Sequence, residues 1–314
     1  MTLPSSGTLS LNQIHVEAGG SSGSQCSLND SDIRGLINKS SGSQMAFTEW
    51  YGASAETVLG SNVAQITVSN YISSGGTFRI PSNRWVYSNS TSTPALTIDI
   101  PCTVINEGKI IGCGAVGGRY YIAATAGGPA INVTSSGVTI TNSSGAFIAG
   151  GGGGGAHGRD HSNPNDYNSG GGGGAGGGAG GLGGSGYANG GTGGGINSAG
   201  SRGYNKYNSQ QIGGYGGGSG GGGGYKGSNV GGGGGGRILP GVGGNSNANN
   251  TALKGGSAGS AGTNSGVHEG GGGGGGWGAS GGSGNRGDAG GSGGAAITGT
   301  SRTLSNSGTI YGST

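Results

Sequence analysis

The sequence is poor in charged residues, in proline and in cysteine. Only 8% of its 314 residues are charged and the net charge is +3, which is too little for counterion-driven binding to nucleic acid. There are 7 prolines, too few for a collagen-like chain. The 3 cysteines, Cys26, Cys102 and Cys113, form an odd set without metal-site spacing. No nucleic-acid partner and no disulfide framework are therefore expected.

Long apolar runs are also missing. No segment approaches the ~18 apolar residues of a membrane span, and none has the apolar core of a secretory signal. We therefore expect synthesis in a cytoplasm. Hydrophobic residues make up 29% of the chain, against roughly 45–50% in ordinary proteins with glycine counted, and most precede Gly150. A small apolar core is thus expected in the N-terminal half only.

Arrangements typical of enzymes are absent as well. The four histidines are His15, His157, His161 and His268. Their contexts are unlike one another, so no catalytic triad or carboxylate pair can be argued and no enzymatic activity is expected. The G-x-G-x-x-G match at 112–117 is not followed by an amphipathic helix, so no cofactor is predicted. Pro164 and several asparagines place His157 and His161 in a loop, where their spacing indicates no metal.

Residues 1–55 have the pattern of a small separate module. Ser10 is a plausible N-cap for a helix that runs to Ala18 and stops at the glycines after it. Asn29 or Asp30 can cap a second turn through Ile33 and Leu36. Both helices are too short to be stable alone, so they must pack on each other or on a partner.

Residues 56–148 alternate between apolar and polar side chains. Examples are Leu96–Ile100 and Ala130–Val133, and valine, isoleucine, threonine and tyrosine are enriched between turns. This pattern predicts β-strands. Because the strands are short and closely spaced, a meander or a sandwich layer is favoured over βαβ units.

One local pattern occurs three times, at Val104–Gly112, Thr141–Gly150 and Ser305–Gly312. Each copy has an Asn and Gly turn, then an apolar β-like pair, then a glycine. Asn and Gly tolerate the positive φ of a tight turn, which indicates one structural corner used three times. The alternative is chance recurrence in a chain rich in these residues.

Glycine is the most abundant residue, with 90 copies. It is concentrated in tracts at 150–155, 170–186, 213–224, 231–236 and 270–276. From Gly278 to Gly293 every third residue is glycine, which is the period of polyproline II geometry. Rods in this conformation can hydrogen-bond laterally only where no Cβ intervenes. The tracts therefore predict packed polyglycine II helices, and the alternative is a disordered low-complexity segment.

The predicted fold is a small N-terminal helical/β attachment module (1–55) and a β-rich region (56–148), followed by a polyglycine II helix sandwich with irregular loops (149–314). Aromatic and basic residues lie between the glycine tracts, and this combination is typical of binding loops. The alternative is that the tyrosines only cover the edges of the rods. The predicted receptor-binding residues are Tyr120, Tyr121, His157, Arg159, His161, Tyr167, Tyr204, Lys206, Tyr207, Tyr225 and Lys226.

The corner at 140–149 that leads into a glycine tract, the inserts rich in Asn and Tyr, and the end at 306–312 resemble a known family. They are similar to the glycine-rich adhesins at the tips of long tail fibres of T-even-type phages, over about residues 100–314. The resemblance implies binding to an outer-membrane protein or lipopolysaccharide of a Gram-negative host. Inserts 156–169, 197–212 and 237–254 are then the best loop candidates, with 119–126 and 225–230 next.

The N-terminus differs from those adhesins. Leu3–Ile14, Ser27–Asp30 and Thr48–Gly52 resemble instead a short leader of various phage tail-tip and fibre proteins. This implies attachment to a tail-fibre protein through residues 1–55 and a location at the fibre tip of the virion. Two other functions stay open: a fibre-assembly chaperone, and a structural glycine-rich protein of an ice-binding or cell-wall type.

Overall fold

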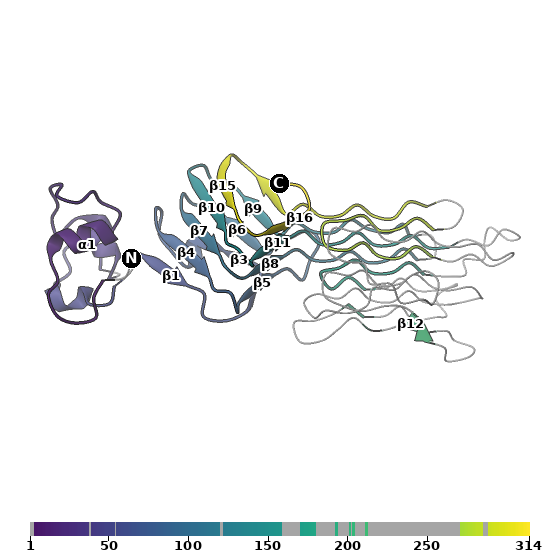
Figure 1. Ribbon diagram of the computed structural model, residues 1–314, viewed down its shortest axis with the longest axis horizontal. Helices are drawn as coiled ribbons and strands as arrows, with labels where there is room; N and C mark the ends of the chain where they lie inside the picture. The colour runs from purple at the N-terminus through teal and green to yellow at the C-terminus, as the bar shows by residue number, and fades with distance from the viewer. Residues whose placement is uncertain are drawn as a thin grey trace, which may run out of the picture.

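The computed structural model describes residues 3–37, 39–53, 55–119, 122–158, 170–179, 192–193, 201, 203–204, 211–212, 271–284 and 288–314. Figure 1 shows three parts along the long axis of the molecule: an N-terminal module, a stack of strands, and extended glycine-rich segments. No helix in the described ranges is long and apolar enough to cross a membrane.

The N-terminal module contains short helices around a small apolar core. The helices are α1 (Leu11–Glu17), α2 (Ser31–Gly35) and the 3-10 helix η1 (Phe47–Trp50). Ser10 caps α1 through a capping box with Gln13, and Asp30 stands at the N-cap of α2, so both predicted helices are confirmed. Ile14, Ile33 and Trp50 are fully buried against one another with Leu3. The indole Nε1 of Trp50 donates to the Ile33 carbonyl (3.0 Å).

The rest of the described chain is built mainly from short strands. They are β1 (Glu56–Val58), β2 (Val63–Ala64), β3 (Ile66–Thr67), β4 (Thr77–Ile80), β5 (Trp85–Tyr87), β6 (Leu96–Ile98), β7 (Thr103–Asn106), β8 (Lys109–Ile111), β9 (Ile131–Val133), β10 (Val138–Asn142), β11 (Phe147–Ala149), β12 (Gly203–Tyr204), β13 (Gln211–Ile212), β14 (Ile297–Gly299), β15 (Arg302–Asn306) and β16 (Thr309–Tyr311). A second 3-10 helix, η2 (Val68–Asn70), follows β3.

Three parallel sheets make a solenoid. Sheet A has the order β1-β4-β7-β10-β15, sheet B the order β2-β5-β8-β11-β16, and sheet C the order β3-β6-β9-β14. The chain visits A, B and C in turn and then returns to A, so each round is one coil stacked on the previous one. The antiparallel pair β12 and β13 lies outside these sheets.

The interior of the solenoid is filled by columns of aligned apolar side chains. Alternation in the strands turns every second residue inward. The register of the parallel pairs places each inward apolar side chain next to an apolar side chain of the neighbouring strand. In sheet A, Phe78 aligns with Val104 and Val104 with Ile140. In sheet B, Val86 aligns with Ile110 and Ile110 with Ile148. These side chains are buried in one continuous core, so the predicted strands and an apolar core in the N-terminal half are confirmed. The restriction of the core to that half is wrong, because Ala296 and Ile297 belong to the same core.

A ladder of asparagines fixes the corner between sheets A and B. Asn106 Nδ2 donates to Asn142 Oδ1 (2.8 Å), and Asn142 Nδ2 donates to Asn306 Oδ1 (2.8 Å). The same two amides also donate to the carbonyls of Phe147 and Thr309, at 3.3 Å each. Each asparagine lies near the start of one of the three repeated sequence patterns, and their strands are in register. The predicted corner used three times is therefore confirmed.

Replacing the central member of this ladder should be costly. Asn142 is fully buried, so Asn142→Ala removes its hydrogen bonds and leaves buried groups of its partners unsatisfied. We expect a loss of about 2–4 kcal/mol in the free energy of unfolding, measured by denaturant titration. Asn306→Ala is the matched control: Asn306 is exposed, water can replace its amide, and the loss should stay below about 1 kcal/mol. Equal losses in the two variants would contradict this account.

The predicted fold class is wrong. The described fold consists mostly of parallel β-sheets with few helices, and it is not a helical attachment module and β region followed by a polyglycine II sandwich. Strands β14, β15 and β16 come after the glycine tracts and complete the same sheets. The glycine-rich region is therefore inserted within the β-fold.

The expected meander or sandwich layer is also wrong. A meander pairs neighbours antiparallel through short hairpins, whereas every pair in sheets A, B and C is parallel. Parallel pairing needs a long crossover. In this chain the crossover for each sheet is provided by the strands of the other two, so short, closely spaced strands are compatible with a parallel fold.

Candidate functional site

The two long excursions of the chain leave the solenoid at one corner, between sheets B and C. Residues 112–130 connect β8 to β9, and residues 150–296 connect β11 to β14. Ile111 is paired with Ala149 where the excursions begin, and Ile131 with Ile297 where they end. The register therefore brings both excursions out side by side, although they are far apart in the sequence.

Segment 150–156 forms the centre of the excursion. Its amides donate to different neighbours in turn: Gly151 and Gly154 to the carbonyls of Gly128 and Thr125, Gly152 and Gly155 to those of Ala175 and Gly172. Gly153 and Ala156 donate to a third neighbour, segment 279–282. We call 112–119, 122–130, 150–157, 170–179, 271–284 and 288–296 the glycine bundle. Its described segments are held together by backbone hydrogen bonds.

The glycines of this bundle leave no room for side chains. A Cβ on Gly151 would lie 1.8 Å from the carbonyl oxygen of Cys113, and one on Gly153 would lie 1.8 Å from that of Gly291. Distances this short are not compatible with a side chain at either position. Since their backbone groups already pair with neighbours, the inner glycines have little chemistry left for recognising a ligand.

An aromatic cluster fastens the bundle to sheet B. Trp277 of the bundle packs on Phe147 of β11 and Tyr311 of β16, with ring centroids 4.8 and 5.7 Å apart. Trp85 meets Phe147 edge-on, and Lys109 Nζ lies 4.2 Å from the centroid of a Trp85 ring. Trp277 is only 8% exposed, so this cluster acts mainly as an anchor.

Several turns of the excursions meet at the end of the bundle away from the solenoid. Arg119 and Ile122 pair through both backbone amides (2.9 and 2.7 Å). Gly118 and Gly284 are both packed against the backbone of His157. The described ends of three segments, at Arg119, Gly158 and Gly284, therefore lie close to one another in the bundle.

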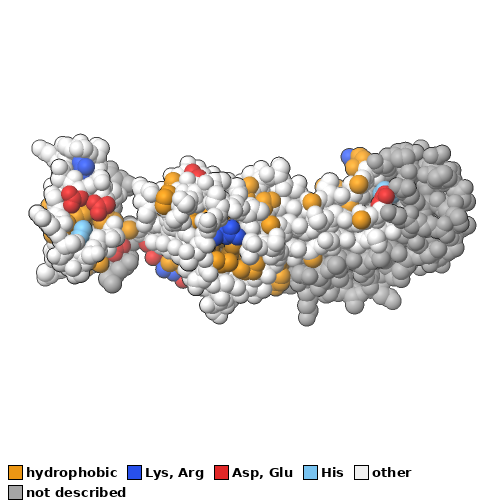
Figure 2. Space-filling model, turned by 90° about the horizontal axis from the view of Figure 1, so that it is seen from above, with side chains coloured by type: hydrophobic (Ala, Val, Ile, Leu, Met, Phe, Trp, Pro, Cys, Tyr) orange, Lys and Arg blue, Asp and Glu red, His pale blue; other side chains and the backbone are white. Residues whose placement is uncertain are grey.

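A hollow of about 320 Å³ lies beside the first of these turns. Its lining residues are Val116, Gly117, Arg119, Ile122, Ala123 and Thr125. Val116 and Ile122 are 45% and 47% exposed, which is unusual for large apolar side chains in a small area. In Figure 2, hydrophobic and basic side chains gather on the surface near the glycine-rich end. We call this hollow the tip hollow.

Among the predicted site residues, His157 is the one whose side-chain burial and partner the structure describes. Its side chain is 3% exposed and its Nε2 lies 3.1 Å from Asp288 Oδ2. It was expected in a solvated loop, but it ends a packed segment of the bundle instead. Pairing of its side chain with Asp288 and packing of Gly118 and Gly284 against its backbone explain the difference, because none of these contacts is visible in the local sequence.

The other predicted site residues are described less completely. Tyr204 lies in β12, where its backbone pairs with Gln211 of β13. The site residues outside the described ranges are Tyr120, Tyr121, Arg159, His161, Tyr167, Lys206, Tyr207, Tyr225 and Lys226. Among described residues, no group of three or more His, Cys, Asp or Glu side chains could hold a metal ion.

Val116 was missed as a candidate site residue, whereas Arg119 and Ile122 lie in the insert 119–126 that was a secondary loop candidate. Their sequence context, Val116-Gly-Gly-Arg119 followed by two tyrosines and Ile122, contains a weak signal, since large apolar residues next to glycines have few neighbours to bury them. Asp288 was also missed. Its partner His157 is far away in sequence, so only the packing of the bundle brings them together.

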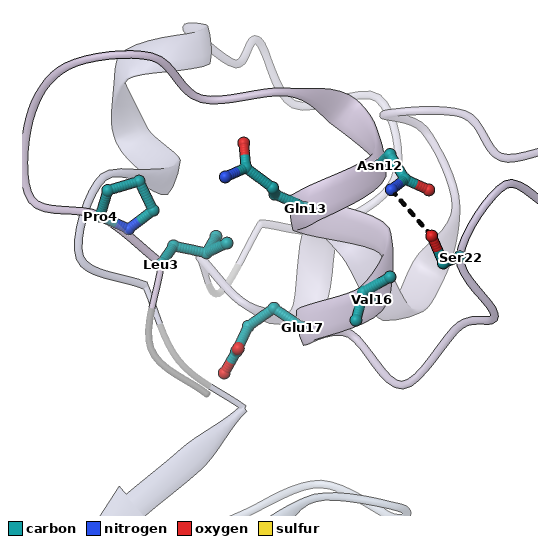
Figure 3. A pocket seen from close by; sticks show the side chains of 7 residues that line it. All are labelled: Leu3, Pro4, Asn12, Gln13, Val16, Glu17 and Ser22. Carbon is teal, nitrogen blue, oxygen red and sulfur yellow. Dashed lines mark hydrogen bonds between the residues drawn. The ribbon is translucent and has the colours of Figure 1, made fainter.

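The N-terminal module has a hollow of its own, of about 270 Å³. Figure 3 shows that Leu3 and Pro4 face Gln13, Val16 and Glu17 of α1 across it. Its other lining residues are Asn12 and Ser22, joined by a hydrogen bond of 3.2 Å from Asn12 Nδ2 to Ser22 Oγ. Val16 is 38% exposed at this hollow. The module therefore has a partly apolar surface. It lies at the opposite end of the molecule from the glycine bundle (Figure 1).

Comparison with known proteins decides the family. A model of the family described as phage tail fibre adhesin Gp38 matches residues 48–220, more than half of the chain. The chain belongs to this family. The match runs from η1 through most of the solenoid into the excursion at 150–296, so the Gp38-type adhesin includes both the scaffold and part of the glycine bundle. The predicted phage tail-fibre adhesin is confirmed at this level.

One solved structure is similar to the adhesin over most of its length. It is the gp37-gp38 adhesin tip complex of the bacteriophage S16 long tail fibre, with 17% sequence identity, a TM-score of 0.43 and coverage of 90% of each chain. A search of curated proteins gave no match.

Proposed function

We propose that this Gp38-family adhesin binds a receptor on a Gram-negative host through the segments carried at the far end of the glycine bundle. The receptor is an outer-membrane protein or lipopolysaccharide, and binding involves no catalysis. The observation that supports this is the shared exit of both excursions at the corner between sheets B and C. These two excursions carry the tyrosine-rich and arginine-containing inserts of the sequence.

The chemistry of the bundle supports the same division of roles. Inner glycines use their backbone groups on one another, so discrimination between receptors has to come from side chains in the connecting segments. Tyrosine and arginine supply apolar area, stacking and charge-assisted hydrogen bonds. We extend the proposal to a place at the tip of a T-even-type long tail fibre, in line with the sequence resemblance over residues 100–314.

We also propose that residues 1–55 attach the adhesin to a tail-fibre protein. The module has its own buried core, which shares no residue with the core of the solenoid. A separate core lets the module serve a separate partner without disturbing the scaffold. The hollow beside Val16 is a surface available for that contact.

Replacing two tyrosines of one insert tests receptor binding. Phage carrying Tyr204→Ala with Tyr207→Ala should adsorb to its host at least about tenfold more slowly, because each aromatic hot spot contributes about 1–3 kcal/mol, or about tenfold to a hundredfold in affinity. Adsorption is measured by loss of free phage over time at equal melting temperature of wild-type and variant proteins.

Tyr71→Ala is the matched control for this experiment. Tyr71 is 38% exposed on the solenoid next to Phe78, so its loss should leave adsorption unchanged. Wild-type adsorption of the double variant, together with wild-type adsorption of Tyr167→Ala with Arg159→Ala, would move receptor binding away from these inserts.

A further inference from the structure

We propose that the outer face of sheet B is a second binding site, which takes an acidic saccharide. The site is a row of four side chains that we call the sheet B row: Trp85, Lys109, Phe147 and Thr309. This goes beyond the proposed function, because the row lies on the solenoid scaffold and not in the inserts of the glycine bundle. The ligand is a sugar chain that carries phosphate or carboxylate groups.

The register of sheet B places the four side chains of the row next to one another. Trp85 of β5 aligns with Lys109 of β8, and Lys109 aligns with Phe147 of β11. Phe147 aligns in turn with Thr309 of β16. The residue after each of the first three is buried in the solenoid core, so alternation along the strands turns the row outward. Strands lie about 4.8 Å apart, so the row is about 14 Å long and can contact more than one ring of a sugar chain.

The sheet B row keeps part of its surface in solvent. Trp85, Lys109 and Phe147 are half-buried, and Thr309 is exposed. Figure 2 shows basic side chains beside a hydrophobic patch in the middle part of the molecule. The Trp85 and Phe147 rings meet edge-on, at 82° and with centroids 6.1 Å apart, so they do not stack face to face. The C–H groups of a sugar ring pack well against aromatic surface of this kind.

Lys109 makes the row electropositive. Its Nζ lies 4.2 Å from the centroid of a Trp85 ring and 5.7 Å from that of Phe147. Within the described ranges no ion pair engages Lys109, and none engages Arg84, which directly precedes Trp85. The strands of sheet B contain no acidic residue. A cation held among aromatic rings, with no carboxylate on the same face, attracts an anionic group of a ligand.

Sheet A shows the opposite arrangement. Arg79 of β4 forms ion pairs with two carboxylates, those of Glu56 and Glu107. Glu107 is only two positions before Lys109 in the sequence, but it pairs with Arg79 instead. The positive charge on sheet A is therefore neutralised within the fold, whereas the positive charge on sheet B is available to a ligand.

The polar groups around the rings favour a saccharide over a protein surface. Asn62 Oδ1 accepts from the Trp85 amide (3.0 Å), which holds this exposed side chain beside the row and leaves its Nδ2 to donate to a ligand. The exposed hydroxyl of Thr309 lies at the other end of the row. Sugar hydroxyls need donors and acceptors of this kind next to the aromatic surface. The centre of a protein interface is instead depleted in lysine, and Lys109 is at the centre of the row.

Titration of the full-length adhesin with a host oligosaccharide tests the proposal. The probe is the lipid-free oligosaccharide of lipopolysaccharide from the strain on which the phage grows, and calorimetry gives its affinity. Lys109→Gln removes the charge and Trp85→Leu removes the aromatic surface, and each should weaken binding about tenfold. Lys39→Gln is the matched control, because it makes the same change of charge on the N-terminal module, where Lys39 pairs with Glu49. Its affinity should equal wild type.

Two treated probes identify the acidic group of the ligand. Removal of phosphate from the oligosaccharide should weaken wild-type binding about tenfold where the anion is a phosphate, and reduction of its carboxyl groups should do so where it is a carboxylate. Lys109→Gln should lose no further affinity for the treated probe that wild type binds weakly. Full wild-type affinity for an oligosaccharide that lacks both groups would overturn the proposal.

Other outcomes would also overturn it. One is wild-type affinity in both Lys109→Gln and Trp85→Leu at unchanged melting temperature, and another is a wild-type adhesin that does not bind the oligosaccharide. Virions that lack the Lys109→Gln adhesin, although the purified variant binds the oligosaccharide normally, would assign the row to a fibre protein instead. The variant with Tyr204→Ala and Tyr207→Ala separates this site from the proposed function. It should bind the oligosaccharide through the row as wild type does, while its slower adsorption would still support receptor binding by the inserts.

Discussion

Phage that carry the adhesin without residues 1–55 should contain no adhesin in their particles, although the truncated protein should still bind host cells. The module and the solenoid have separate cores, and the solenoid begins at Glu56. Removal of the module therefore leaves the solenoid core and the glycine bundle complete. The measurement is immunodetection of the adhesin in purified virions, with cell binding of the purified protein alongside.

A point substitution makes the same test without shortening the chain. Trp50 is fully buried and donates to Ile33, so Trp50→Ala should cost about 3–5 kcal/mol, more than so small a core can lose. Incorporation should fail as it does in the truncated protein. Phage with Val58→Ser, an exposed change just beyond the module, should incorporate normally. Normal incorporation of the truncated adhesin would contradict attachment through this module.

Gly154→Ala should disrupt the glycine bundle and reduce adsorption by at least the factor expected for the tyrosine double variant. The amide of Gly154 donates to Thr125 (3.1 Å) and its carbonyl accepts from Gly291 (2.7 Å). An added Cβ would lie 2.1 Å from the carbonyl oxygen of Val116. Backbone has to move to relieve this overlap, at a cost of about 3 kcal/mol or more.

Gly60→Ala is the matched control for Gly154→Ala. A Cβ at Gly60 has nothing within 4 Å and the residue has no positive φ, so alanine should leave stability within about 0.5 kcal/mol of wild type. Thermal unfolding followed by circular dichroism gives the difference in stability, and loss of free phage gives adsorption. A Gly154→Ala protein that matches Gly60→Ala in both measurements would show that the bundle tolerates side chains at its centre.

Local features of the fold could be predicted from the sequence, whereas its long-range pairing could not. Ser10 and Gln13 predict their helix start because a capping box is complete within four residues. The asparagine corners were visible as three similar patterns. Their stacking was not, since Asn142 and Asn306 are 164 positions apart and alternation along a strand does not specify its partner. For this reason the glycine-rich region was predicted to follow the β-region, although it is inserted into it.

The candidate site shows the same limit. Tyrosine and arginine inserts could be identified by composition, and family membership supports a role in adhesion. The burial of His157 by Asp288 and the meeting of Val116 with Ile122 in one hollow depend on hydrogen bonds between segments of the bundle. No periodicity within a single segment carries that information.

The position of the excursion at 150–296 also sets an order of folding. Strand β10 has its partner β7 close by in the sequence, so the first three coils, together with β10 and β11, can form as soon as their own residues are available. Strand β10 cannot pair with β15 until the chain beyond the whole excursion is available, because β15 follows the excursion in the sequence. Closing so long a loop is slow unless the intervening chain is already compact. Completion of the last coil therefore depends on prior ordering of the glycine bundle. Once formed, the end of the chain holds both ends of the excursion, because the amides of Gly150 and Ala296 donate to the carbonyls of Tyr311 and Ser313.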